Sequence, residues 1–194
     1  MLLFIPAAQV QMAPLPPTPA IEALQAQLKG VAEVFLGGQR GAMKGRIAEV
    51  RKGWSQSQTE LRKVFSDAEV QAGEQQLKAL DAMKPAEQAA GALAMASSLA
   101  RTRPAGRATE AAKADLLVML AWCHLEAGQW GRMPQMDLAL KPLLAQDKGD
   151  QPLVMISLKD AARRVQAAQP KKDGPAARKA LKELRGLLAG LAKG

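Results

Sequence analysis

Apolar residues recur every three or four positions along most of this 194-residue chain, the spacing that places them on one face of an α-helix. This spacing holds from Ile21 to Phe35, and the two glycines that come after it favour a helix end. Ser66, with Glu69 three residues later, has the form of a capping box and predicts a new helix start. Helices are predicted from residue 21 to the glycines at 37–38, over 39–65, over 66–84, from 85 to the linker at 101–107, over 109–127, after 134, over 152–168 and over 175–192.

The predicted helix at 109–127 is the most apolar of the chain. It contains the run LLVMLAWC without a charged residue, which predicts that other helices surround it. The predicted loops are short, and helices joined by short loops pack as antiparallel neighbours. The pattern therefore predicts an all-α fold of stacked antiparallel helical hairpins, either a short solenoid or an irregular bundle, with a single domain over residues 20–194.

Residues 1–19 differ from the rest of the chain because they combine a short apolar run with a proline-rich stretch. The combination is typical of the end of a secretory signal followed by a spacer, but no basic residue precedes the apolar run. The alternative is a flexible tail that docks Leu3 and Phe4 on the core. An exported or periplasmic location and a cytoplasmic location are therefore both open. No later segment contains the roughly 18 consecutive apolar residues that a membrane-spanning helix needs.

Composition favours a type of source genome and a class of binding partner. Aromatic residues make up only 3% of the chain, and alanine, glycine, arginine and proline are frequent, which favours a GC-rich bacterial genome. The net charge is +9, and the excess of lysine and arginine is concentrated in residues 39–64 and 151–194. Such basic segments favour an acidic protein partner, a nucleic acid or an anionic lipid surface.

The segment at about 114–150 resembles one tetratricopeptide repeat. Its sequence LLVMLAWCHLEAGQW has His124 where that family has an aromatic residue. Gly128 and Trp130 match a glycine and an aromatic residue at the hairpin turn, and LLAQDKGD matches the end of the second helix. The resemblance implies a helix–turn–helix packing unit and a protein-binding role. Lys148 stands where the family has proline, and the segment after Trp130 is about three residues longer than the repeat.

The same segment holds the only cysteine and the only histidine of the chain. Cys123 and His124 are neighbours on the predicted helix, so their side chains point about 100° apart and cannot easily form a nucleophile–base pair. A metal site would need further ligands, which only carboxylates can supply. We therefore predict no catalytic residue, no cofactor-binding residue and no metal ligand, and we interpret the cluster as hairpin packing. Its residues are Trp122, Cys123, His124, Gly128 and Trp130.

A glycine-rich stretch at 37–45, GGQRGAMKG, invites comparison with a phosphate-binding loop. It lacks the GxxxxGK[S/T] spacing, and no predicted strand precedes it. We interpret it as the end of one helix and the basic start of the next.

The last predicted helix separates apolar from basic residues. One face carries Leu181, Leu184, Leu188 and Leu191, and this face is expected to dock on the helix at 152–168. The basic residues are expected to face water, where an acidic partner can bind them. The candidate partner-binding face consists of Lys171, Lys172, Arg178, Lys179, Lys182 and Arg185.

These features favour a non-enzymatic helical module for protein–protein interaction or scaffolding. The partner is expected to be another protein, and charge complementarity favours an acidic one. The alternative is a basic helical protein that binds nucleic acid or anionic surfaces nonspecifically through its C-terminal face. Binding of that kind would weaken as salt rises.

Overall fold

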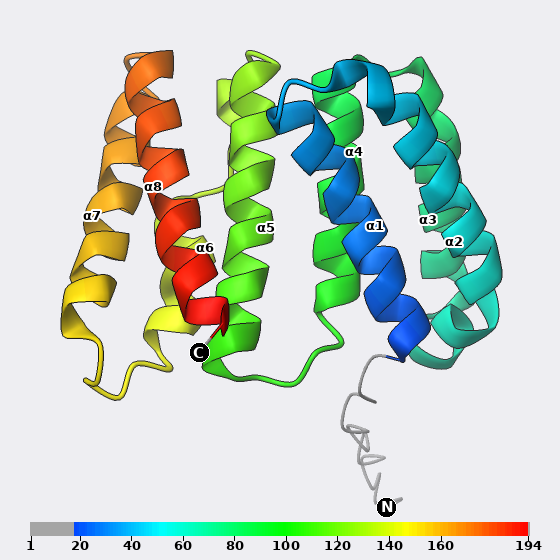
Figure 1. Ribbon diagram of the computed structural model, residues 1–194, viewed down its shortest axis with the longest axis horizontal. Helices are drawn as coiled ribbons and strands as arrows, with labels where there is room; N and C mark the ends of the chain where they lie inside the picture. The colour runs from blue at the N-terminus through cyan, green and yellow to red at the C-terminus, as the bar shows by residue number, and fades with distance from the viewer. Residues whose placement is uncertain (1–17, 194) are drawn as a thin grey trace, which may run out of the picture.

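The computed structural model describes residues 18–193, which form eight α-helices and no β-strand (Figure 1). Successive helices run in opposite directions and are joined by short loops, so the predicted all-α fold of stacked antiparallel hairpins is confirmed. Residues 1–17, most of the predicted N-terminal segment, lie outside the described residues. The helices are α1 (Pro19–Leu36), α2 (Met43–Val64), α3 (Asp67–Ala79), α4 (Pro85–Ala100), α5 (Arg107–Glu126), α6 (Met136–Leu144), α7 (Pro152–Ala168) and α8 (Gly174–Lys193).

Local sequence explains where several helices begin. A proline occupies the first turn of α1, α4 and α7, where its missing N–H costs no intrahelical hydrogen bond. At the start of α3, the Ser66 hydroxyl accepts a hydrogen bond from the Glu69 backbone N–H at 3.3 Å. The Glu69 carboxylate accepts one from the Ser66 backbone N–H at 3.0 Å. The predicted capping box is therefore confirmed.

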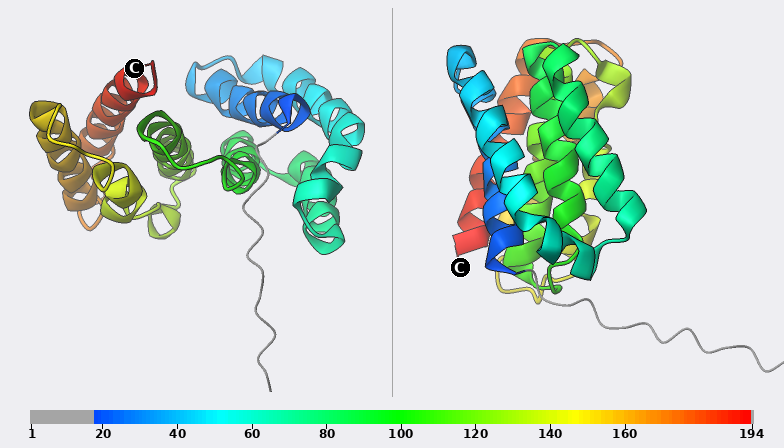
Figure 2. Two further views of the ribbon diagram at one scale, coloured as in Figure 1. Left: turned by 90° about the horizontal axis from the view of Figure 1, so that it is seen from below. Right: turned by 90° about the vertical axis from the view of Figure 1, so that its right-hand side faces the viewer.

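The helices form two four-helix units of the same topology, α1–α4 and α5–α8. In each unit the first helix packs against the second and the fourth, the second contacts the third, and the third contacts the fourth. α4 and α5 pack against each other and join the two units. Seen from below, the units lie side by side, with α7 at one end of the molecule and α2 and α3 at the other (Figure 2).

The same turn follows the first helix of each unit. Its sequence is Gly-Gln-x-Gly-x-Met, at residues 38–43 and 128–133. The first glycine has a left-handed backbone in both turns, with φ of 79° at Gly38 and 71° at Gly128, which a residue without Cβ adopts readily. A 3-10 turn comes next, and the final methionine is buried in both cases. The glycine-rich stretch at 37–45 and the turn between α5 and α6 therefore contain the same structural element.

α5 contributes to both hydrophobic cores of the molecule. Leu116, Met119 and Cys123 pack into the core of the first unit. A different face of the helix packs into the core of the second unit. A helix that is buried on two faces must be apolar around most of its circumference, which explains the uncharged run within 109–127 and confirms its central place. The residues that face the second core are Ala111, Ala114, Val118, Ala121 and Leu125.

α1 has in the first unit the place that α5 has in the second, but only one of its faces is apolar. When α1 and α5 are aligned so that Gly38 corresponds to Gly128, each α5 residue of the second core corresponds to a buried apolar residue of α1. On the face that points away from the first core, its outer face, Lys29 and Glu33 stand at the positions that correspond to Met119 and Cys123. This outer face is therefore polar, and it pairs with charged residues of the second unit. The buried residues of α1 in question are Ile21, Leu24, Leu28, Val31 and Phe35.

The left-handed glycine of the second turn should be sensitive to substitution. Gly128→Ala is expected to lower the free energy of unfolding by about 1 kcal/mol, because a Cβ strains the backbone at a φ of 71°. Gly131→Ala is the control, because Gly131 has no positive φ and an added Cβ would meet no atom within 4 Å. Urea unfolding followed by circular dichroism measures both variants. Equal stability of the two would contradict the assigned turn geometry.

Candidate binding surfaces

The residues of the predicted hairpin cluster lie around the turn between α5 and α6, but they do not converge on one site. Cys123 is fully buried in the first core, and burial raises the pKa of its thiol to about 12. Trp122 and Trp130 are partly buried against the second core, and Gly128 forms the turn. The thiol is therefore protonated at neutral pH, as is typical of a structural cysteine.

His124 belongs to a hydrogen-bonded chain that links the two units. Its Nδ1 lies 3.0 Å from the side-chain Oε1 of Gln129, and Gln129 Nε2 donates to Glu87 Oε1 of α4 at 2.9 Å. Because an amide oxygen only accepts, the proton of the neutral imidazole is on Nδ1. Burial lowers the pKa of His124, and the hydrogen bond to Gln129 opposes that shift. Within residues 18–193, no three His, Cys, Asp or Glu side chains are grouped so as to hold a metal ion.

The burial of Cys123 predicts a slow reaction with alkylating reagents. Iodoacetamide at pH 8 is expected to leave the native protein almost unlabelled, because the thiol is both inaccessible and protonated. The same chain in urea is the control and should label completely. Mass spectrometry of intact protein measures both. Native labelling as fast as that of the unfolded chain would show that this part of α5 is not packed as described.

Two arginines of the predicted basic face pair with carboxylates of α5. Arg178 pairs with Glu126 near the end of α5, with Nε–Oε1 at 2.6 Å and Nη2–Oε2 at 3.2 Å. This pairing lowers the pKa of Glu126. Arg185 Nε lies 3.1 Å from Asp115 Oδ1, also on α5. Arg178 is still 48% exposed and Arg185 29% exposed, so both guanidinium groups reach water, but neither is unpaired, because α8 packs against α5 as well as against α7.

Asp115 is the centre of a charge cluster between α1, α5 and α8. Its side chain is 11% exposed and accepts a hydrogen bond from Lys29 Nζ at 2.7 Å as well as the one from Arg185. Both cations also approach Glu33, at 3.9 Å and 4.0 Å. The cluster fills the place where the polar outer face of α1 meets the second unit. The predicted leucine seam of α8 is buried.

Four lysines of the predicted face remain exposed. Lys171, Lys172, Lys179 and Lys182 form no ion pair with a carboxylate in the part of the chain that the structure describes. Lys171 and Lys179 line one groove, between the end of α7 and the start of α8, whose floor consists largely of alanine. We call these four residues the lysine surface.

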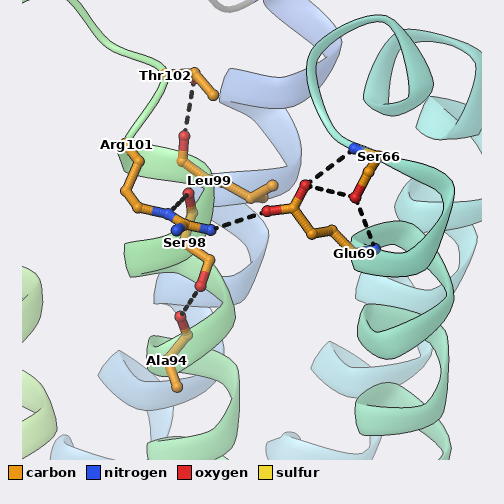
Figure 3. Close-up of polar contacts among 7 residues, drawn as sticks. All are labelled: Ser66, Glu69, Ala94, Ser98, Leu99, Arg101 and Thr102. Atoms are coloured by element: carbon orange, nitrogen blue, oxygen red, sulfur yellow. Dashed lines mark hydrogen bonds and ion pairs between the residues drawn. The ribbon is translucent and has the colours of Figure 1, made fainter.

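An apolar cleft opens between α3 and α4 in the first unit, with a volume of about 180 Å³. α3 and α4 contact each other little, whereas their counterparts α7 and α8 pack closely in the second unit. Figure 3 shows Glu69 of α3 and Arg101, just after α4, on opposite sides of this space. We call it the α3–α4 cleft. Its large apolar lining residues are Trp54, Leu61, Phe65, Val70, Met95 and Leu99.

One ion pair bridges the α3–α4 cleft. Arg101 Nη2 lies 3.5 Å from Glu69 Oε1, and the Arg101 side chain is 66% exposed (Figure 3). The other Glu69 oxygen accepts hydrogen bonds from the backbone N–H and the hydroxyl of Ser66. These hydrogen bonds lower the pKa of Glu69. The Glu69 carboxylate is therefore held by its own helix, and its contact with Arg101 is long and exposed to water.

Trp54 lines the α3–α4 cleft from α2 and is only 6% exposed. Its ring packs on Gly73 of α3 so closely that an added Cβ would clash with it. The indole N–H has no hydrogen-bond partner among the described residues. Buried donors are normally satisfied, so this one requires an explanation. Sequence analysis missed the cleft, and its one local signal is a glycine at a core position of α3, between Val70 and Leu77.

Comparisons with protein-family models, with curated proteins and with solved structures find no match for this chain. The resemblance of residues 114–150 to a tetratricopeptide repeat therefore stays a prediction. No helix in the range 18–193 is long and apolar enough to cross a lipid bilayer. The lysine surface and the α3–α4 cleft have to be interpreted from their own geometry.

Replacing the two paired arginines of α8 should destabilise the fold. Arg178→Gln combined with Arg185→Gln is expected to lower the free energy of unfolding by about 1–2 kcal/mol, because two carboxylates of α5 lose partners close to the surface. Lys179→Gln combined with Lys182→Gln removes the same charge from the same helix and should change it by less than about 0.5 kcal/mol. Urea titration compares the two. An equal loss in the lysine variant would mean that the ion pairs contribute no specific stability.

Proposed function

We propose that this protein is a non-enzymatic helical interaction module that binds an acidic segment of another protein on the lysine surface. The observation that supports the proposal is a contrast within the basic face. Both of its arginines pair with carboxylates of α5, whereas its lysines have no such partner in residues 18–193. Ammonium groups that form no ion pair within that range, and that together with Arg164 outnumber the one carboxylate of the groove, Asp173, create a positive potential that attracts a negatively charged partner.

The groove beside α8 supports a polypeptide as the partner. Lys171, Lys179 and Arg164 flank it, and the last of these pairs with Glu183 at 2.6 Å. Its alanine floor offers apolar contact area between the cations. A segment that carries carboxylates beside small apolar side chains complements both features at once.

Nucleic acid fits this surface less well than an acidic polypeptide does. Arginine recognises phosphate through bidentate contacts, but both arginines of the basic face are occupied by carboxylates of α5. Residues 164–193 contain no aromatic residue on which a base can stack. The lysines are the cations of this face that form no ion pair among the described residues, and an ammonium group provides charge without the bidentate geometry of a guanidinium.

Binding of fluorescein-labelled poly-L-glutamate tests the proposal, with a variant in which the lysine surface is changed to glutamine. The control variant loses the same charge from exposed first-unit lysines that also lack ion pairs in the described range. Fluorescence anisotropy at low salt is expected to show at least a tenfold weaker affinity for the lysine-surface variant, and less than about threefold for the control. Parental binding should fade as salt rises. The control substitutions are Lys44→Gln, Lys52→Gln, Lys78→Gln and Lys84→Gln.

Two outcomes would overturn the proposal. Equal losses in the two variants would show that binding reflects net charge and not this surface. Tighter binding of a double-stranded DNA than of poly-L-glutamate, lost in the same lysine-surface variant, would assign the surface to nucleic acid instead.

A further inference from the structure

The α3–α4 cleft is hollow where the second unit is filled by its own side chains. In the second unit, Leu158 and Val165 of α7 and Leu184 of α8 are fully buried between closely packed helices. In the first unit the corresponding helices leave about 180 Å³ between them. An engineered apolar cavity of roughly 150 Å³ binds benzene. The cleft therefore has room for an aromatic ring, or for a chain of about six to eight carbons.

The walls of the α3–α4 cleft are mainly apolar, so the main part of a ligand has to be apolar as well. Leu61, Val70 and Leu99 are buried residues of the first core that also line the cleft. Phe65 and Met95 extend this lining. Moving an apolar body from water into such a lining is favourable in proportion to the area that is covered.

Two donors at the cleft lack a strong partner, and the exposed amide of Gln76, which offers both a donor and an acceptor, also lines it. The indole N–H of Trp54 is buried and has no acceptor within residues 18–193. The Arg101 guanidinium is exposed, and its ion pair with Glu69 is 3.5 Å long. The Ser98 hydroxyl is not free to donate to a ligand, because it already donates to the Ala94 carbonyl oxygen at 3.2 Å (Figure 3). The cleft therefore favours a ligand that brings hydrogen-bond acceptors and negative charge.

We propose that the α3–α4 cleft binds a small monocarboxylate with an apolar body, an aryl or alkyl acid of the size of 3-phenylpropanoate. The carboxylate pairs with Arg101, and the apolar body lies between Trp54 and Leu99. Glu69 does not have to move, because its other oxygen stays bonded to Ser66 when Arg101 turns to the ligand. This site goes beyond the proposed function, because it lies in the other unit and uses none of the lysine surface.

The indole N–H signals of the full-length protein in a ¹⁵N–¹H spectrum provide a specific readout, because Trp54 can be assigned with a Trp54→Phe variant. Titration with 3-phenylpropanoate is expected to shift the Trp54 signal saturably and to leave those of Trp122 and Trp130 in place. The amine of the same shape, 3-phenylpropan-1-amine, should bind at least tenfold more weakly, because it brings a cation and donors to a site that already has both.

Substitution of the exposed arginine tests the carboxylate contact without disturbing the core. Arg101→Gln is expected to weaken 3-phenylpropanoate binding about tenfold, because the charge-assisted contact is lost. The matched control is Arg62→Gln, an arginine of similar exposure (56% against 66%) that does not line the cleft, and it should bind like the parent. Circular dichroism confirms that both variants fold.

Three results would overturn this proposal. One is a Trp54 signal that does not move at millimolar 3-phenylpropanoate. Another is equal affinity for the amine and the acid. The third is unchanged affinity in the Arg101→Gln variant. None of these results bears on the lysine surface, so failure here and failure of the proposed function are distinguishable.

Discussion

The fold depends on the burial of α5 on two faces. One face closes the core of the first unit through Leu116, Met119 and Cys123, and another closes the core of the second unit. Few helices of a chain this short can be apolar all round, because each such helix needs neighbours on every side. α5 obtains them from α4, α6 and α8, with a smaller contribution from α1. The two units therefore share a wall and are not simply linked in sequence.

Charged and polar contacts between the two units add to the apolar contacts of α5. Where α1 approaches the second unit, Asp115 joins Lys29 to Arg185, and the chain from His124 through Gln129 reaches Glu87 of α4. The Asp115 cluster lies between α1, α5 and α8, and only the chain from His124 reaches α4; water still reaches both, so each contact contributes little alone. The geometric effect is larger, because the pairs of Arg185 with Asp115 and of Arg178 with Glu126 hold both arginines of α8 against α5 and leave the lysines of that helix to meet a partner.

Local pattern predicted the helices well because each one carries its own signals. The capping box at Ser66, the prolines in first turns and the uncharged run of α5 are all local, and the structure has helices where these signals place them. The repeated Gly-Gln-x-Gly-x-Met turn was also present in the sequence, but its two copies were interpreted separately. The pairing of Arg178 with Glu126 spans 52 residues and depends on how α8 meets α5, which periodicity does not contain. The α3–α4 cleft was missed for the same reason, because it results from the divergence of two helices that look ordinary in sequence.

Hydrogen exchange of the Leu24→Ala variant tests most directly whether α5 couples the two units. Leu24 is buried in the first core and has no part in the second. Its truncation should lower the free energy of unfolding by about 3 kcal/mol. If the units share α5 as one cooperative structure, the slowest-exchanging amides of α7 and α8 should lose as much protection as those of α1. Unchanged protection in α7 and α8 would show that the second unit stands without the first and would contradict the central role assigned to α5.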